Sequence, residues 1–171
     1  MTSLRADEHL VLIGMMGTGK TTVGQIVAER LHRPFLDSDE EIEARTGHTV
    51  REIFEQHGEA AFRTLETEVL EEALAAPERA VIAAAGGVVL SERNRRALQQ
   101  AAARVVWLCA DPASLVERVQ RGGHRPLLDG DPAGTLQRMW DERHELYRSV
   151  ADVVVAVDGR SVDDIVEEVL R

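Results

Sequence analysis

The sequence predicts a three-layer α/β fold built around a parallel sheet. Five short β-rich runs, at residues 9–14, 34–39, 80–85, 104–109 and 152–157, alternate with segments of helical periodicity. Continuous apolar strands of this kind are buried on both faces, and parallel neighbours need the crossover connections that the helices supply. A length of 171 residues and a hydrophobic fraction of 44% suit one core of this type, so we expect a single domain over residues 1–171.

The composition narrows the possible functions. The formal net charge of -10 argues against a general nucleic-acid or acidic-membrane binder, because such proteins neutralise phosphates with excess Lys and Arg. The first residues lack the apolar core of a signal peptide, and no apolar run reaches the length of a membrane span. We therefore expect a cytoplasmic protein without nucleic-acid or membrane partners. The single cysteine, Cys109, excludes an intramolecular disulfide.

The first strand leads into a phosphate-binding motif. Gly14, Gly19, Lys20 and Thr21 satisfy G-x-x-x-x-G-K-[ST], between an apolar strand and the helical segment 21–31. Glycines let successive backbone N–H groups face phosphate, Lys20 reaches the terminal phosphates, and the Thr21 hydroxyl can ligate Mg²⁺. The motif predicts ATP or GTP with Mg²⁺, the alternative being an ordinary glycine-bearing turn. The residues expected to hold the nucleotide here are Gly17, Thr18, Gly19, Lys20, Thr21 and Thr22.

The second strand ends in two carboxylates. Ligands of doubly wound sheets bind beyond the carboxyl ends of strands, and the two-residue spacing of Asp37 and Asp39 in an extended chain aims both side chains the same way. One would serve Mg²⁺ and the other a substrate hydroxyl. Alternatively, Ser38 and Glu41 form an S-x-x-E capping box for the next helix, and Asp39 only favours the helix dipole.

A charged pair interrupts the apolar pattern of the helical segment 59–74. Glu66 falls on a stripe of apolar residues, and Arg63 lies one turn before it. The other members of the stripe are Phe62, Leu65, Val69 and Ala73. An inward-facing charge needs a partner, whereas the alternative is an exposed i, i+3 pair of Arg63 with Glu66.

After the third strand, Gly86 and Gly87 allow backbone N–H groups to approach a ligand, or simply turn the chain. Arg143 is more informative, because it occupies an apolar slot of the helical segment 135–150. The apolar residues of that stripe are Leu136, Met139, Trp140, Leu146, Tyr147 and Val150. An unpaired buried guanidinium is costly, and its planar geometry suits bidentate capture of a carboxylate. That carboxylate belongs either to a substrate or to a structural salt bridge.

The loop 121–134 concentrates Gly, Pro and Asp and predicts a mobile lid. Arg125 on this loop would swing over a triphosphate and neutralise the charge that develops during phosphoryl transfer. Arg118 and Arg121 precede it on a predicted helix and would contact adenine or phosphate, or stay solvated at the surface.

Together, six motifs resemble those of the shikimate kinase family, and the resemblance covers nearly the whole chain. They are "GMMGTGKTT", "FLDSDEEIEARTG", "IFEQHGEAAFRTLE", "AGGVVL", "RPLL" and "ERHELYRSVAD". The resemblance implies a nucleoside-monophosphate-kinase-like P-loop fold with a five-stranded parallel sheet, a substrate-binding region at about 38–66 and a lid at about 112–130. It also implies ATP-dependent phosphorylation of the shikimate 3-hydroxyl in chorismate and aromatic amino acid biosynthesis, with Mg²⁺, by a monomer.

The resemblance also implies a role for each candidate residue. Asp39 would bind the ring hydroxyls of shikimate and act as or assist the base. Arg63 and Arg143 would clamp its carboxylate. Glu66, Gly86 and Gly87 complete the expected substrate site, with Gly86 offering a backbone contact.

On the nucleotide side, the resemblance implies that Lys20 and Arg125 stabilise the transferring phosphoryl group. Thr21 would ligate Mg²⁺ directly and Asp37 through water. Arg118 would stack on adenine, and Arg160 would line the same pocket.

One position departs from the family pattern, since Ala85 stands where the first of three glycines is usual. A positive φ would strain alanine there, whereas a strand that continues through Ala85 makes the change mild, and we expect the mild case. Two rival functions are a gluconate-type or nucleoside-monophosphate kinase on the same fold, and a non-catalytic relative that binds ATP or shikimate. The two-arginine clamp argues against a neutral acceptor, and the joint presence of Lys20, Thr21, Asp39 and Arg125 argues against a non-catalytic protein.

Overall fold

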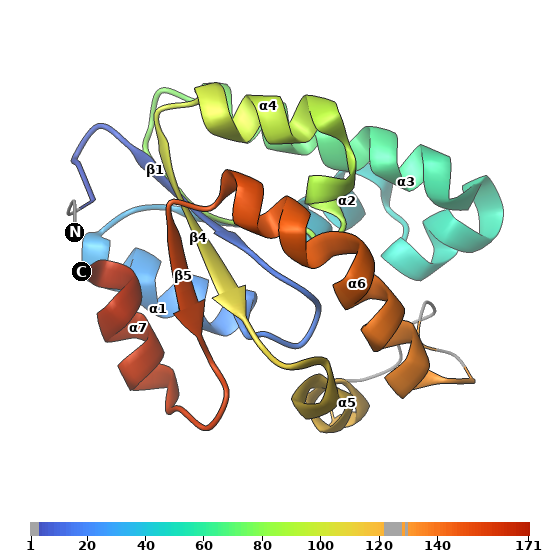
Figure 1. Ribbon diagram of the computed structural model, residues 1–171. Coiled ribbons are helices and arrows are strands. Elements are labelled where there is room, and N and C mark those ends of the chain that lie inside the picture. Colours follow the sequence, from blue (N-terminus) through green and yellow to red (C-terminus); the bar gives the residue numbers. More distant parts are fainter. Residues whose placement is uncertain (1–3, 122–127, 129) are drawn as a thin grey trace.

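Five parallel strands form the central sheet in the order β2-β3-β1-β4-β5 (Figure 1). The computed structural model describes residues 4–121, 128 and 130–171. The strands are β1 (His9–Ile13), β2 (Phe35–Asp37), β3 (Val81–Ala83), β4 (Ala103–Cys109) and β5 (Val153–Ala156). Every pair of neighbouring strands is parallel. Each strand falls inside a run predicted from the sequence, except that β4 begins one residue earlier, at Ala103. The predicted α/β class is therefore confirmed.

Helices supply the crossovers between the strands and cover both faces of the sheet (Figure 1). They are α1 (Lys20–Leu31), α2 (Ser38–Thr46), α3 (Val50–Ala75), α4 (Glu92–Gln100), α5 (Pro112–Arg121), α6 (Pro132–Val150) and α7 (Val162–Leu170), with a short 3₁₀ turn η1 (Val88–Leu90). One face carries α1 and α7, and the other carries α3, α4 and α6. None of these described helices combines the length and apolar character needed to cross a membrane.

The main core forms where the strands are sandwiched between these two helix layers. All five residues of β1 are buried, which is why this strand reads as a continuous apolar run rather than an alternating one. Trp107 of β4 lies under α6, where its ring packs against those of Trp140 and Tyr147, with centroids 5.9 and 5.6 Å away. This packing fixes α6 on the sheet.

A second, smaller core cluster joins α2, α3 and the end of β3. Its buried members are Ile42, Ile53, Phe62, Val69 and Ala85. Ala85 is 6% exposed, and among the described residues His32 is the only non-glycine residue with a positive φ. The mild outcome expected for Ala85 is thus confirmed, but the reason differs: β3 ends at Ala83, and the Ala85 methyl group is accommodated by packing beneath α2 and α3.

Candidate active site

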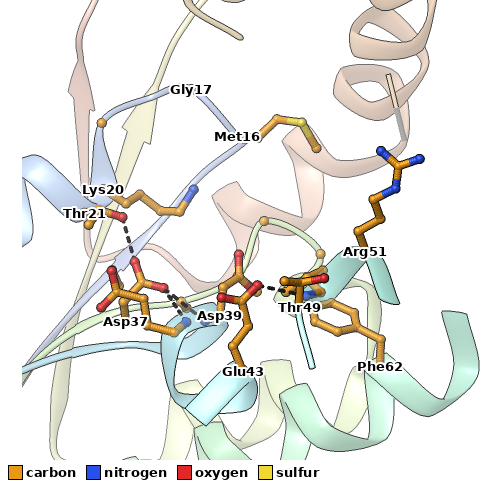
Figure 2. Close-up of a pocket in the computed structure, with 18 of the residues that line it drawn as sticks. Met16, Gly17, Lys20, Thr21, Asp37, Asp39, Glu43, Thr49, Arg51 and Phe62 are labelled. Atoms are coloured by element: carbon orange, nitrogen blue, oxygen red, sulfur yellow. Dashed lines mark hydrogen bonds between the residues drawn. The ribbon is translucent and has the colours of Figure 1, made fainter. Parts of the chain in front are cut away.

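A cavity of about 780 Å³ opens beyond the carboxyl ends of β1, β2 and β3. This is the edge where ligands bind in doubly wound sheets. The strands β2 and β3 lie on one side of β1, and β4 and β5 lie on the other, so the order in which strands are added changes direction at β1. Figure 2 shows Lys20, Thr21 and Asp37 at one end of this cavity, Asp39 between, and Phe62 with Arg51 at the other end. The predicted site residues that line it are Gly17, Gly19, Lys20, Thr21, Thr22, Asp37, Asp39, Arg63, Gly86, Gly87, Arg118 and Arg143.

The loop after β1 has the shape expected of a phosphate cradle. Gly17 has a φ of 83°, in the left-handed region that favours glycine, and α1 begins at Lys20. The Lys20 ammonium donates to the carbonyl oxygens of Gly14, at 2.7 Å, and Met15, at 3.0 Å. Thr18 is buried, and its hydroxyl donates to the Met15 carbonyl at 2.8 Å, so this side chain stabilises the loop itself.

The carboxylate of Asp37 connects this loop with α2. One oxygen accepts from the Thr21 hydroxyl at 2.6 Å, and the other accepts from the backbone N–H groups of Asp39, at 3.0 Å, and Glu40, at 3.3 Å. Asp37 is therefore the N-cap of α2. The proposed capping box of Ser38 and Glu41 is wrong, because Ser38 is already the first helical residue.

Asp39 also differs from the sequence expectation in its backbone. It lies in the first turn of α2 rather than in an extended chain, so strand alternation is not what aims it. Both Asp37 and Asp39 nevertheless line the cavity (Figure 2), because the turn into α2 comes directly at the end of β2. The pair was identified from the right residues with the wrong local geometry.

Thr21 and Asp37 suit Mg²⁺ bound together with phosphate. Both offer hard oxygen donors, and they already meet beside the phosphate loop. No cluster of three or more His, Cys, Asp or Glu that could hold a metal occurs among the described residues.

Arg63 lies between a buried and an exposed carboxylate. Its guanidinium pairs with Glu66 at 3.0 Å and with Glu59 at 3.1 Å. Glu66 is only 1% exposed, so the i, i+3 pair exists but is not the surface pair considered as an alternative. A Cβ atom at Gly87 would lie 2.1 Å from the Arg63 Nη1, so the guanidinium passes directly over the turn after β3 and would have to move if a side chain stood there.

Burial changes the chemistry of Glu66. Desolvation raises the pKa of its carboxyl to about 7, although the charge of Arg63 acts in the opposite direction. The negative charge of Asp39 raises the pKa of Glu66 further, and the positive charge of Arg143 lowers it. Glu66 therefore lies at the centre of a charge cluster in which two arginines face two carboxyl groups.

Arg143 is buried, as the helical spacing predicted, and is 5% exposed. Its Nε lies 3.5 Å from a carboxylate oxygen of Glu142, whose side chain is 58% exposed, and this Nε makes no hydrogen bond within the described residues. A buried structural salt bridge would need a better partner. The geometry leaves this guanidinium available to a group that enters the cavity.

Arg118 and Arg160 were both expected near adenine. Arg118 lines the cavity, and its Nη2 donates to the Val157 carbonyl at 3.3 Å. Arg160 does not line it, since its guanidinium binds Glu168 and the carbonyl oxygens of Ala156 and Asp164. A contact of Arg160 with adenine stays a prediction that would require these bonds to break.

The predicted lid is described in part. Arg121 is exposed at the end of α5, and its Nη2 lies 3.8 Å from a carboxylate oxygen of Glu117. Arg125 lies outside the described residues, as do residues 122–124, 126, 127 and 129 of the same loop.

Two features of the cavity were not predicted from the sequence. Phe54 and Phe62, with ring centroids 4.9 Å apart, form an apolar wall opposite the phosphate loop. The buried Tyr147 hydroxyl donates to the Gly86 carbonyl behind the cavity. Only the position of Tyr147, one turn after Arg143 on the same stripe, could have signalled this bond.

Known proteins resemble this chain along almost its whole length. The family described as shikimate kinase matches residues 16–171. A shikimate kinase of Symbiobacterium thermophilum is 45% identical over 166 residues, which cover 95% of this chain and 94% of that protein. A structure of shikimate kinase from Acinetobacter baumannii in complex with shikimate superposes with a TM-score of 0.91 at 39% identity, over 96% of this chain and 92% of that one.

A gluconokinase from Sinorhizobium meliloti superposes less closely. Its TM-score is 0.68 at 22% identity, with 97% of this chain and 91% of that chain covered. At this level of identity the likeness shows a shared fold and nothing about the substrate.

Glu66→Gln should alter how stability depends on pH. The carboxyl titrates near 4.5 when unfolded and near 7 when folded, so the folded protein binds an extra proton between these values. The free energy of unfolding of the wild type should therefore fall by roughly 2 kcal/mol as the pH rises through this interval, a loss that the glutamine variant lacks. Urea unfolding at about pH 5 and about pH 7.5 measures the difference.

Glu59→Gln is the matched control, because Glu59 pairs with the same arginine but is exposed. The free energy of unfolding of Glu59→Gln should differ from that of the wild type by nearly the same amount at both pH values. If Glu66→Gln behaves in the same way, Glu66 is ionised throughout and the buried charge cluster is balanced differently.

Proposed function

Since the chain belongs to the shikimate kinase family, we propose that it transfers the terminal phosphoryl group of ATP to the 3-hydroxyl of shikimate, forming shikimate 3-phosphate and ADP. This reaction is a step in the biosynthesis of chorismate and the aromatic amino acids. The observation that carries the proposal is that two arginines from different helices, Arg63 and Arg143, face one cavity with the phosphate-binding loop.

The acceptor would be held by its carboxylate. A guanidinium presents paired N–H donors that match the two oxygens of a carboxylate, and such charge-assisted bonds are stronger in a water-poor cavity. Arg143 supplies a buried guanidinium whose Nε makes no hydrogen bond to the part of the chain that the structure describes, and Arg63 supplies one held in place by Glu59 and Glu66. Phe54 and Phe62 would cover one face of the substrate ring.

We assign Asp39 to the reacting hydroxyl. It lines the cavity, and Figure 2 shows it between Lys20 and Thr21 at one end and Phe62 at the other. Because Arg63 follows Phe62 in α3, a substrate whose carboxylate is clamped by the arginines would place its 3-hydroxyl near Asp39. A carboxylate there can orient the hydroxyl by accepting its hydrogen bond and take its proton as the new O–P bond forms. The phosphoryl group passes directly from ATP to the acceptor, so no covalent enzyme intermediate is needed.

The donor phosphates would be held by the loop around Gly17 and Gly19 and by Lys20. In the free protein Lys20 binds two loop carbonyls, so it must exchange these for phosphate oxygens when ATP arrives. Thr21 and Asp37 would hold Mg²⁺, Thr21 directly and Asp37 through water, and the bound metal would neutralise phosphate charge. Arg125 would add a further cation from the lid, which we propose spans residues 112–130 and begins with α5.

We propose residues 38–66 as the substrate-binding region, because α2 and the first half of α3 supply Asp39, Phe54 and Arg63. We also propose that the protein acts as a monomer in the cytoplasm, where ATP is available. Supporting this, the cavity already combines the phosphate loop, a carboxylate and both arginines within one chain.

A coupled assay of ADP release tests the function. Purified protein with ATP and Mg²⁺ should release ADP fastest with shikimate in a panel that also contains quinate, gluconate, AMP and CMP. Chelation of Mg²⁺ should abolish turnover, and NMR of the product should place the phosphate on the 3-oxygen. Faster turnover with gluconate or a nucleoside monophosphate would favour the rival kinase functions, and turnover with none would favour a non-catalytic binder.

Arg143→Ala should weaken shikimate binding by about 50-fold or more, because a charge-assisted contact to the carboxylate is lost. ATP affinity and the melting temperature of the free protein should change little, since Glu66 keeps its pair with Arg63 and Glu142 is exposed. Preference for shikimate over its neutral amide should largely vanish. The control is Arg148→Ala on the same helix, where the side chain is 67% exposed. A large loss of stability with the carboxylate preference retained would instead make Arg143 a structural residue.

Asp39→Asn keeps the shape of the side chain and removes its charge, and it should lower kcat by roughly 100-fold if Asp39 handles the proton. Steady-state kinetics with both substrates provide the measurement. Glu41→Gln is the control, because it removes one negative charge from the same helix at a residue whose carboxylate pairs with Arg45. A near-normal kcat for Asp39→Asn would limit Asp39 to stabilising the start of α2.

A further inference from the structure

Tyr147 joins α6 to the turn after β3 through one buried hydrogen bond. The residue is 0% exposed, and its hydroxyl donates to the carbonyl of Gly86. Its ring stacks on Trp107 of β4, with centroids 5.6 Å apart and planes inclined by 26°. The stacking on Trp107 of the sheet and the attachment to α6 together fix the position of the hydroxyl.

The turn that Tyr147 holds lies against the phosphate-binding loop. A Cβ atom at Gly86 would be 3.5 Å from the Gly14 carbonyl oxygen and 3.6 Å from the Met16 nitrogen, so the two segments are in contact. Gly86 and Gly87 line the cavity, whereas Tyr147 does not. A shift of this turn would therefore move one wall of the acceptor site relative to the donor site.

The same face of α6 carries Arg143, one helical turn before Tyr147. Burial raises the pKa of Tyr147 to about 12, and the nearby charge of Arg143 acts in the opposite direction. The hydroxyl therefore keeps its proton across the working pH range. It has one proton, which goes to Gly86, so toward Arg143 it can only accept.

We infer that Tyr147 is a positioning residue for the acceptor: its hydroxyl fixes the Gly86–Gly87 peptide and the Arg143 guanidinium relative to each other and to the phosphate loop. The peptide is trans, as are all described peptide bonds, so holding the Gly86 carbonyl toward α6 aims the Gly87 N–H the opposite way. Phenylalanine would fill the same space but would fix neither group. The inference rests on the proposed function, because the acceptor in question is shikimate.

Tyr147→Phe removes only the hydroxyl and should separate the two substrates kinetically. The kcat/KM for shikimate should fall by about 10-fold or more, while the KM for ATP stays within about twofold. Preference for shikimate over its neutral amide should also decrease. In a double-mutant cycle with Arg143→Ala, the losses in shikimate affinity should be clearly less than additive, because the two residues act on the same carboxylate.

Val150→Ala is the matched control, since Val150 is 6% exposed and lies one turn further along the same helix. It should lower the melting temperature and leave both KM values unchanged. If Tyr147→Phe lowers the melting temperature in the same way without changing shikimate kinetics, Tyr147 is only a core residue and the inference is overturned.

A second measurement uses the native side chain and does not depend on the folding of the variant. Tyr147 is the only tyrosine of the chain, so biosynthetic replacement by 3-fluorotyrosine gives one ¹⁹F resonance. Saturating shikimate should shift this resonance, and the neutral amide should shift it less. A resonance that shikimate leaves unmoved, although the labelled protein turns over shikimate, overturns the inference. If the wild type does not phosphorylate shikimate at all, the proposed function fails instead.

Discussion

Both oxygens of the Asp37 carboxylate are engaged, and the relative positions of α1 and α2 depend on them. One oxygen accepts from the Thr21 hydroxyl in the first turn of α1, and the other caps the N-terminus of α2. Because α1 carries the phosphate-binding lysine and α2 carries Asp39, this carboxylate connects the donor half of the site with the acceptor half. Mg²⁺ held by Thr21 directly and by Asp37 through water would use two side chains that already meet, so little reorganisation is required.

The balance of charged side chains that line the cavity differs from that of the whole chain. The formal net charge is -10, whereas the basic side chains that line the cavity outnumber its carboxylates by one. The basic residues are Lys20, Arg51, Arg63, Arg118 and Arg143, and the carboxylates belong to Asp37, Asp39, Glu40 and Glu43. Buried Glu66 pairs with Arg63, and this pairing offsets the cost of its burial. An anionic acceptor entering the cavity would then meet guanidinium groups that are already oriented. Orientation before binding lowers the entropy cost of holding the substrate.

The fold was predictable because its signals are local and strong. Apolar runs gave all five strands, and the strand–glycine loop–helix order gave the phosphate site. Arg143 was also found, since a charge on an apolar stripe violates helical periodicity visibly. The expected geometry was wrong where a backbone detail decided the outcome: Asp39 lies in the first turn of α2 rather than in an extended chain, and Ala85 lies beyond the strand. No local pattern distinguishes these cases, because tertiary contacts set them.

The phosphate-binding loop is contacted from two sides, and this explains why its glycines matter beyond phosphate. On one side lies the Gly86 turn of the acceptor site. On the other side lies α5, where a Cβ atom at Gly17 would come within 3.0 Å of Val119 and 3.7 Å of the Arg118 Cβ. Since Arg118 and the start of the lid belong to α5, a loop that adjusts to ATP must also adjust to this helix. The loop therefore lies against both α5 and the proposed acceptor turn, so a shift of the loop on ATP binding would be transmitted to both neighbours.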